Sequence, residues 1–233
     1  MDAIIVKNLK KNYGKIQAVK GISFNVRKGE IFGLIGPNGV GKTTVLRILA
    51  TILKKSDGEI KIFGYEIGKD DEKIRKIISY LPEEAGAYKN MRGIEYLKFM
   101  KNFFEKGNVD KAAKIANLGE RIYDKIENYS KGMVRRLLVA RTLMGEPKLA
   151  ILDEPTSGLD VINANEIRNV IKRFAQDGTT FLISSHNMLE VEYLCDEIAL
   201  MNNGYIVESG APSQLMEKYG ARNIEEVFMK VIK

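Results

Sequence analysis

The chain has 233 residues, and its 37 Lys and Arg side chains against 30 Asp and Glu give it a formal net charge of +7. With 45% hydrophobic and 29% charged residues, the composition excludes collagenous, low-complexity and disordered chains, and the length allows one domain with a substantial apolar core. The single cysteine, Cys195, excludes an internal disulfide and fits a reducing compartment. No apolar run approaches the roughly 20 residues of a membrane helix, and residues 1–7 lack a signal-peptide pattern, so we expect neither a membrane span nor a leader.

Positive charge gathers at residues 7–11, 69–76 and 131–136. No aromatic side chains interleave these clusters, which favours a solvated surface over a nucleic-acid groove. A basic surface also suits phosphate ligands or an anionic membrane face, so charge alone does not choose between those partners. We expect no nucleic-acid partner.

Strand patterns open the chain. Apolar and polar side chains alternate over residues 22–27, which predicts a half-buried strand, and Lys28-Gly29 predicts a turn after it. Residues 31–35 are apolar throughout, as expected of a strand covered on both faces. A glycine-rich loop follows, and the nearly all-apolar residues 44–53 predict a buried helix.

A helical stretch interrupts this β/α pattern. Apolar residues recur at helical spacing from about residue 88 to residue 144, and no strand pattern lies between them. Further on, the sequence predicts buried strands at 148–153 and 180–184 with a helix at 162–175 between them, a hairpin around Asn202-Asn203-Gly204, and short amphipathic helices over the last twenty residues. The expected fold is therefore α/β, with helices inserted into a β/α core.

A phosphate-binding loop is predicted between the strand at 31–35 and the helix that follows it. Its residues match the pattern G-x-x-x-x-G-K-[ST] and are Gly36, Pro37, Asn38, Gly39, Val40, Gly41, Lys42 and Thr43. Glycines allow successive backbone N–H groups to surround a phosphate chain, and the helix N-terminus adds partial positive charge. Lys42 is placed to reach the β- and γ-phosphates, and the Thr43 hydroxyl is placed to bind Mg²⁺.

Two acidic residues end the predicted strand at 148–153 and start the loop after it. The carboxylate of Asp153 emerges at the carboxyl edge of the sheet, where open α/β folds bind ligands, and can hold Mg²⁺ beside Thr43. Glu154 follows directly and is a candidate base that polarises water near the γ-phosphate. Without the phosphate loop, an acidic pair here would be an ordinary solvated turn.

The phosphate loop and three other segments resemble the ATP-binding cassette (ABC) family, in the order in which that family has them. The additional segments are Tyr129-Ser130-Lys131-Gly132-Met133, Asp153 to Asp160, and Ser185-His186. The resemblance covers nearly the whole chain. It implies a P-loop NTPase core with a parallel sheet, an N-terminal antiparallel β subdomain and an inserted α-helical lobe. The domain would be single, with residues 1–87 and 145–233 as the core and about 88–144 as the lobe that carries the signature.

The resemblance implies roles for residues on both sides of the nucleotide. Tyr13 would stack on adenine, and Thr44 would join the phosphate loop in binding the cofactor, ATP. Ser130 and Gly132 match the signature, which meets the γ-phosphate of the opposite subunit in a head-to-tail dimer. From the residues themselves, Ser130 can also cap a helix that begins near Lys131.

Three further residues match the family's loops. Glu83 stands where the family has a Gln that ligates Mg²⁺ and water, and a solvated acidic pair with Glu84 is the alternative. His186 matches the switch histidine that contacts the γ-phosphate, and Asp160 matches a loop residue that crosses the dimer interface. Cys195 lies on an apolar stretch and is expected in the core without chemistry.

The implied function is that of an ATP-binding and hydrolysing subunit of an ABC transporter, which powers transport through a separate integral membrane permease. Its place would be cytoplasmic, peripheral on the inner face of the cell membrane, as a homodimer or paired with another ABC subunit. Signatures of the Ser-Lys-Gly-Met form occur in the branch of the family that drives multidrug, antibiotic or polysaccharide exporters, which favours export. The alternative is a soluble ABC ATPase that acts on ribosomes or nucleic acid. A P-loop kinase or GTPase lacks support, because such proteins have neither the signature nor the Asp160 loop.

Overall fold

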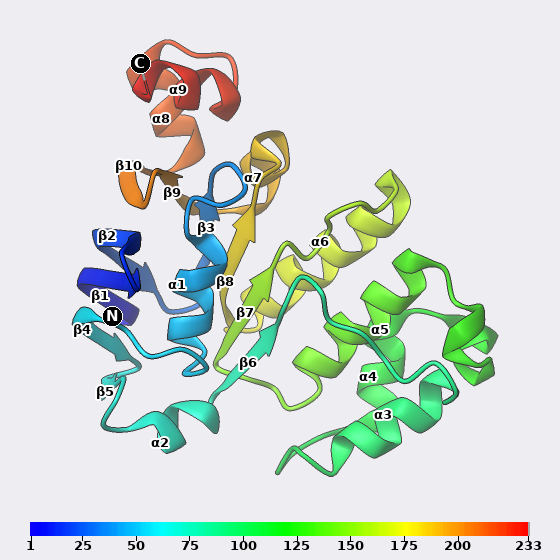
Figure 1. The fold of residues 1–233 in the computed structure, drawn as a ribbon. Helices are drawn as coiled ribbons and strands as arrows, with labels where there is room; N and C mark the ends of the chain where they lie inside the picture. The colour runs from blue at the N-terminus through cyan, green and yellow to red at the C-terminus, as the bar shows by residue number, and fades with distance from the viewer. Residues whose placement is uncertain (233) are drawn as a thin grey trace.

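The computed structural model describes residues 1–232 and contains two β-sheets (Figure 1). The smaller is four-stranded and antiparallel, in the order β2-β1-β4-β5. Its strands are β1 (Asp2–Tyr13), β2 (Ile16–Arg27), β4 (Asp57–Ile62) and β5 (Tyr65–Glu66). The expected N-terminal antiparallel β subdomain is thus present.

The larger sheet is six-stranded, in the order β10-β9-β3-β8-β7-β6. The pairs from β9 to β6 are parallel, and β10 adds an antiparallel edge. Its strands are β3 (Ile31–Ile35), β6 (Ile78–Leu81), β7 (Leu149–Asp153), β8 (Thr180–Ser185), β9 (Glu197–Asn202) and β10 (Tyr205–Gly210). This sheet confirms the predicted α/β class.

Alternating side chains of the parallel strands build two separate cores. In β3, Phe32 and Leu34 pack into a cluster with α1 (Lys42–Leu49) and the antiparallel sheet, whereas Ile31 and Ile35 pack into a cluster with the helices on the other face. Successive side chains of a strand point to opposite faces, so an all-apolar strand needs cover on both sides. Figure 1 shows α1 between the two sheets and α6 (Val161–Gln176) on the opposite side of the larger one.

The helix after the phosphate loop is shorter than predicted. We expected it to continue to residue 53, but α1 ends at Leu49. Thr51 has a left-handed φ of 59°, and the N–H groups of Ile52 and Leu53 turn back to the carbonyl of Arg47. Ile52 is consequently 64% exposed, although its apolar character had suggested burial.

The segment from 88 to 144 is helical, and within the described chain it contains no strand beyond an isolated bridge between Arg92 and Lys125. Its helices are α3 (Gly93–Lys101), α4 (Val109–Ala116), the 3-10 turns η1 (Gly119–Tyr123) and η2 (Ile126–Asn128), and α5 (Lys131–Leu143). These helices lie together on one side of the molecule (Figure 1). A short helix, α2 (Asp71–Arg75), precedes β6.

The C-terminal part follows the predicted pattern. Asn203 and Gly204, both with positive φ, form the tight turn between β9 and β10. Three short helices complete the chain: α7 (Met188–Leu194), α8 (Pro212–Tyr219) and α9 (Ile224–Val231). Cys195 is buried beside Gly33, as expected of a core residue, and burial raises the pKa of its thiol. Within residues 1–232, no helix combines the length and the apolarity that a bilayer span requires.

Candidate nucleotide site

The carboxyl ends of four neighbouring parallel strands bring the predicted motifs to one edge of the sheet. In space the strands run β3, β8, β7, β6, which differs from their order along the chain. The loop after β8, which carries His186, therefore lies between the phosphate loop after β3 and Glu154 after β7. This edge is where parallel α/β sheets bind ligands, because the helices that follow the strands start there.

The phosphate loop joins β3 to α1 with an exposed tip. Pro37, Asn38 and Gly39 are exposed, whereas Gly36 and Val40 are buried. At Gly41, just before α1, φ is 107°, and a Cβ would lie 2.7 Å from the carbonyl oxygen of Ala18, so a larger residue does not fit.

Lys42 starts α1 and turns its side chain back into the loop. Its Nζ donates hydrogen bonds to the carbonyl oxygens of Gly36 at 2.6 Å and Pro37 at 3.1 Å, and the residue is 5% exposed. Burial lowers the pKa of this ammonium, and the nearby charge of Glu154 opposes that effect. Thr44 is half-buried in the first turn of the same helix.

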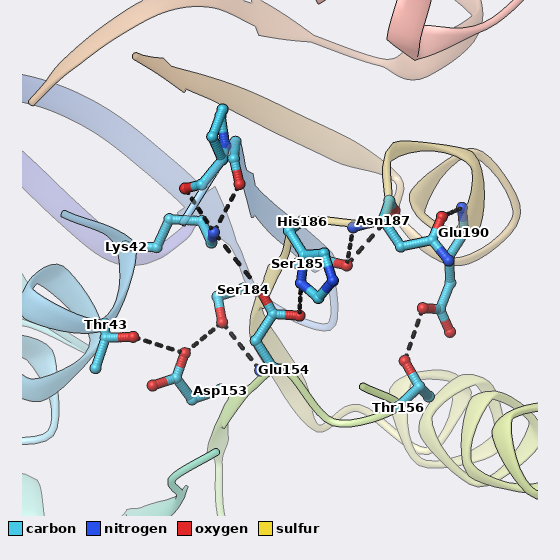
Figure 2. A network of polar contacts seen from close by, with 12 residues as sticks. Lys42, Thr43, Asp153, Glu154, Thr156, Ser184, Ser185, His186, Asn187 and Glu190 are labelled. Atoms are coloured by element: carbon cyan, nitrogen blue, oxygen red, sulfur yellow. Dashed lines mark hydrogen bonds and ion pairs between the residues drawn. The ribbon is translucent and has the colours of Figure 1, made fainter. Parts of the chain in front are cut away.

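Asp153 and Thr43 meet as predicted. The Thr43 hydroxyl donates to Oδ1 of Asp153 at 3.2 Å, and the hydroxyl of Ser184 donates to the same oxygen at 2.5 Å (Figure 2). The hydroxyl of Tyr80 donates to Oδ2 at 3.5 Å. Asp153 is 1% exposed. Hydroxyl and carboxylate oxygens are the ligands that Mg²⁺ prefers, so this pair fits that ion, with phosphate and water oxygens completing its coordination.

Glu154 lies between two basic groups. Its Oε2 is 2.9 Å from Nδ1 of His186 and its Oε1 is 3.6 Å from Nζ of Lys42 (Figure 2). The carboxylate is nearly buried, and Oε1 accepts no hydrogen bond within the described residues. Burial raises the pKa of Glu154, and the hydrogen bond from His186 partly offsets that rise. A buried carboxylate with one oxygen that accepts no hydrogen bond suits a proton acceptor.

The backbone of Glu154 has an uncommon conformation. Its φ of 49° lies in the left-handed region, which is costly for a residue with a side chain. Its N–H donates to Oγ of Ser184 at 3.0 Å, and its carbonyl accepts from Nη2 of Arg135 at 2.8 Å. Tertiary contacts on both sides therefore hold the turn that directs the carboxylate toward the phosphate loop.

A second polar network continues from the His186 loop. Glu190 in α7 accepts a hydrogen bond from the Thr156 hydroxyl at 2.7 Å and another from Arg168 of α6 at 3.1 Å. Figure 2 shows Glu190 and Thr156 beside the Glu154 cluster. Glu190 thus ties the helix after His186 to the loop after Glu154.

Ser130 and Asp160 cap two helices. The Ser130 hydroxyl accepts from the N–H of Met133 at 3.2 Å, which confirms the predicted cap at the start of α5. Asp160 caps α6 through the N–H of Asn163, and the Asn163 amide packs against Gly132. Among the hydrogen bonds and ion pairs of residues 1–232, none joins Ser130 or Asp160 to Lys42 or Glu154.

Tyr13 and Glu83 are exposed, and no hydrogen bond or ion pair within residues 1–232 joins their side chains to the Glu154 cluster. Tyr13, at the end of β1, is 46% exposed, and Nζ of Lys11 lies 5.0 Å from its ring centre. Glu83 is exposed in the loop after β6, and its backbone carbonyl accepts from Arg135. Their roles toward adenine and Mg²⁺ stay predictions.

Sequence reasoning missed Ser184, Tyr80 and Arg135. Ser184 is fully buried within an apolar strand, and that position of a polar residue was the available signal. Arg135 lies on the same helical face as Leu138 and Thr142, which are buried, so periodicity could have marked it as a buried charge. Tyr80 carried no such signal.

Known proteins are similar to this chain in both sequence and fold. The ABC transporter family profile matches residues 19–157. The linearmycin resistance ATP-binding protein LnrL of Bacillus subtilis (strain 168) is 38% identical over 224 residues, which cover 94% of this chain and 72% of that protein. The lantibiotic transport ATP-binding protein SrtF of Streptococcus pyogenes is 38% identical over 226 residues, with coverage of 96% and 94%.

Solved structures agree with this result. The structure of an ATP-binding subunit of an ABC transporter superposes with a TM-score of 0.87 at 25% identity and covers 99% of this chain and 100% of its own. A dimeric ATP-binding cassette in a post-hydrolysis state, bound to ADP and Pi, superposes with a TM-score of 0.79 at 25% identity, over 89% and 98% of the two chains. Together with the site at the sheet edge, these matches show that the chain belongs to the ABC transporter family, as an ATP-binding subunit.

Proposed function

We propose that the chain binds ATP at the carboxyl edge of its six-stranded sheet, hydrolyses it, and thereby powers export through a separate integral membrane permease. The observation that carries the proposal is the cluster of Lys42, Glu154 and His186, which come from the start of α1, the loop after β7 and the loop after β8. A buried ammonium suits phosphate binding, and a buried carboxylate with one oxygen that accepts no hydrogen bond suits water activation.

The phosphate chain would bind where α1 begins. The first N–H groups of α1 and those of the glycine loop donate to phosphate oxygens, and the helix dipole favours their negative charge. Lys42 would exchange its two carbonyl acceptors, on Gly36 and Pro37, for phosphate oxygens. Tyr13 would stack on adenine.

Thr43 and Asp153 would hold Mg²⁺, with Glu83 as a further oxygen donor. Their hydroxyl and carboxylate fit the ion, as described above. When bound, Mg²⁺ supplies positive charge that neutralises the β- and γ-phosphate oxygens.

Hydrolysis would proceed by attack of a water oxygen on the γ-phosphorus. A new P–O bond forms, the bond from the γ-phosphorus to the bridging oxygen breaks, and ADP leaves with that bond's electron pair. Glu154 accepts the proton of the attacking water, while His186 holds the Glu154 carboxylate through Nδ1. Lys42 and the loop amides stabilise the charge that develops on the phosphoryl oxygens.

A second ATP-binding subunit would complete each site. Ser130 and Gly132 lie at the N-terminus of α5. Within residues 1–232, neither residue bonds to the Glu154 cluster of its own chain, and a helix N-terminus suits the phosphate of a nucleotide that another subunit holds. We infer that the N-terminus of α5 meets the γ-phosphate held by the opposing subunit, and that Asp160 lies at the same interface. The dimeric cassette among the solved structures supports this arrangement. ATP would close the dimer, and hydrolysis would open it.

The proposed role in export through a membrane permease rests on the names of similar proteins. The names of LnrL and SrtF specify linearmycin resistance and lantibiotic transport, which supports export of an antibiotic or peptide class of compound. The subunit would then lie on the inner face of the cell membrane. Residues 88–144 would form a lobe, with the core in 1–87 and 145–233.

The test measures ATP hydrolysis and identifies the proteins that bind the chain. The tagged protein is recovered from its cells in mild detergent at moderate salt, its partners are identified by mass spectrometry, and phosphate release from ATP is measured. We expect a multi-span membrane protein in the wild-type sample, and loss of ATP binding in the matched Lys42→Ala variant. Recovery of ribosomal or nucleic-acid partners, with an empty membrane fraction, would overturn the transport role and leave the hydrolysis intact.

A further inference from the structure

Arg135 in α5 is a buried cation whose hydrogen bonds all go to the backbone. It is 8% exposed and donates to five carbonyl oxygens. A guanidinium carries five N–H groups in a rigid fork, so every donor has an acceptor. None of the ion pairs within residues 1–232 includes it.

The acceptors lie in two loops at the candidate nucleotide site. Nη2 donates to the carbonyls of Asp153 at 2.7 Å and Glu154 at 2.8 Å, and Nε donates to Pro155 at 2.9 Å. Nη1 donates to Pro82 and Glu83, both at 3.1 Å. The first three acceptors are the last residue of β7 and the two residues after it, and the other two follow β6, its neighbour in the sheet.

This arrangement fixes the backbone on which the proposed base depends. The left-handed turn at Glu154 is held from one side by Ser184 and from the other by Arg135. Hydrogen bonds from a charged donor are stronger than neutral ones, and a buried carbonyl that loses its donor is costly. Burial lowers the pKa of Arg135, and the negative charges of Asp153 and Glu83 oppose this effect, so the guanidinium stays charged.

The same side chain joins three parts of the site. Arg135 is part of the helix that Ser130 caps, so one rigid element carries both the signature and the bonds to the two loops. A shift of α5 therefore pulls on the backbone of Glu154 and Glu83 together.

We propose that Arg135 is a positioning residue for hydrolysis, which fixes the backbone of Glu154 and Glu83 relative to α5 and acts on the reaction through Glu154. This inference rests on the proposed function, in which Glu154 is the base.

The first experiment compares Arg135→Lys with the wild-type protein. Lysine keeps the charge but has three donors on one atom, so it cannot serve five carbonyls in two loops. We expect kcat to fall about tenfold or more while the KM for ATP changes less than about twofold, because the interaction acts on the base rather than on nucleotide binding. The matched control is Arg141→Lys on the same helix, whose guanidinium contacts the Tyr96 hydroxyl instead of either loop. It should leave kcat unchanged.

A double-mutant cycle separates positioning from simple stabilisation. If Arg135 acts through Glu154, then Arg135→Lys should not slow the residual hydrolysis of a Glu154→Gln background. If the two residues act independently, the fold-losses in kcat of the two single variants should multiply in the double variant. Circular dichroism checks that each variant is folded, and Arg135→Gln serves as a second variant.

A folded Arg135→Lys protein with wild-type kcat, multiplicative effects in the cycle, or loss of folding in both Arg135 variants would each overturn the inference. A wild-type protein without ATP hydrolysis would instead refute the proposed function, so the two failures are distinguishable.

Discussion

Nδ1 of His186 lies 2.9 Å from Oε2 of Glu154, although the two residues follow different strands of the sheet. The carboxylate can only accept, so the imidazole N–H donates and fixes the ring tautomer. Through this contact His186 favours the ionised form of Glu154 against the burial that raises its pKa. The histidine therefore supports the proposed base and leaves its own Nε2 available for another partner.

Replacement of Glu154 by glutamine tests its role directly. Glu154→Gln is nearly isosteric but cannot accept the proton of the attacking water, so hydrolysis should fall by about 10²–10⁴-fold. ATP binding should persist, and a closed dimer should accumulate in ATP. Phosphate release, nucleotide affinity and size-exclusion chromatography measure these outcomes. An unimpaired hydrolysis rate would remove Glu154 from the mechanism.

The pH dependence of hydrolysis should report the buried carboxylate. Burial raises the pKa of Glu154 above the ordinary value of 4.5, and the base is active when deprotonated. The rate should therefore decline as pH falls through this raised pKa, at a higher pH than for an exposed glutamate. The profile of kcat/KM against pH measures it in the free enzyme.

The pH profile of a His186 variant tests the contact between His186 and Glu154. His186→Ala removes the hydrogen bond that lowers the pKa of Glu154, so the acid limb of the residual activity should move to higher pH. An acid limb that stays in place would show that His186 does not influence the ionisation of Glu154.

Ser184 should be a larger contributor to stability than its small side chain suggests. Its hydroxyl accepts from the N–H of Glu154 and donates to Asp153, and the residue is fully buried. Ser184→Ala leaves a buried N–H without a partner and should lower the free energy of unfolding by about 1–3 kcal/mol. Denaturant unfolding measures the loss. Ser185→Ala, next to it on β8, is the control and should cost less; equal losses would contradict this account.

Gly132 should resist the substitution that normally stabilises a helix. Alanine is favoured over glycine inside helices by roughly 0.5–1 kcal/mol. Here, however, a Cβ would lie 2.6 Å from Nδ2 of Asn163, which is tied to Asp160. Gly132→Ala should therefore lower the melting temperature.

A second substitution tests the cause of that loss. Asn163→Ala removes the atoms that a Cβ at Gly132 would meet, so it should recover part of the melting temperature in the Gly132→Ala background. If the double variant is no more stable than expected from the two single losses, the close packing is not the cause.

Local patterns predicted much of the fold, because they depend on neighbours along the chain. Alternation identified the second half of β2, apolar runs identified β3, β7 and β8, and helical spacing identified the segment from 88 to 144. The predicted end of α1 was wrong, since Ala50, Ile52 and Leu53 continue the apolar pattern while the backbone turns at Thr51. Element ends depend on single-residue conformations, which periodicity does not register.

The sequence by itself determined the phosphate loop, the acidic pair after β7 and the cap at Ser130, because each depends on residues adjacent in the chain. Only the tertiary structure decided the cluster of Lys42, Glu154 and His186 and the bonds of Arg135 to two loops. The strand order β3-β8-β7-β6 differs from the order along the chain, so these partners come from segments far apart in the sequence. Which strands pair depends on how both faces of the sheet are buried. That burial is a property of the whole packed core, so no single segment of the sequence determines it.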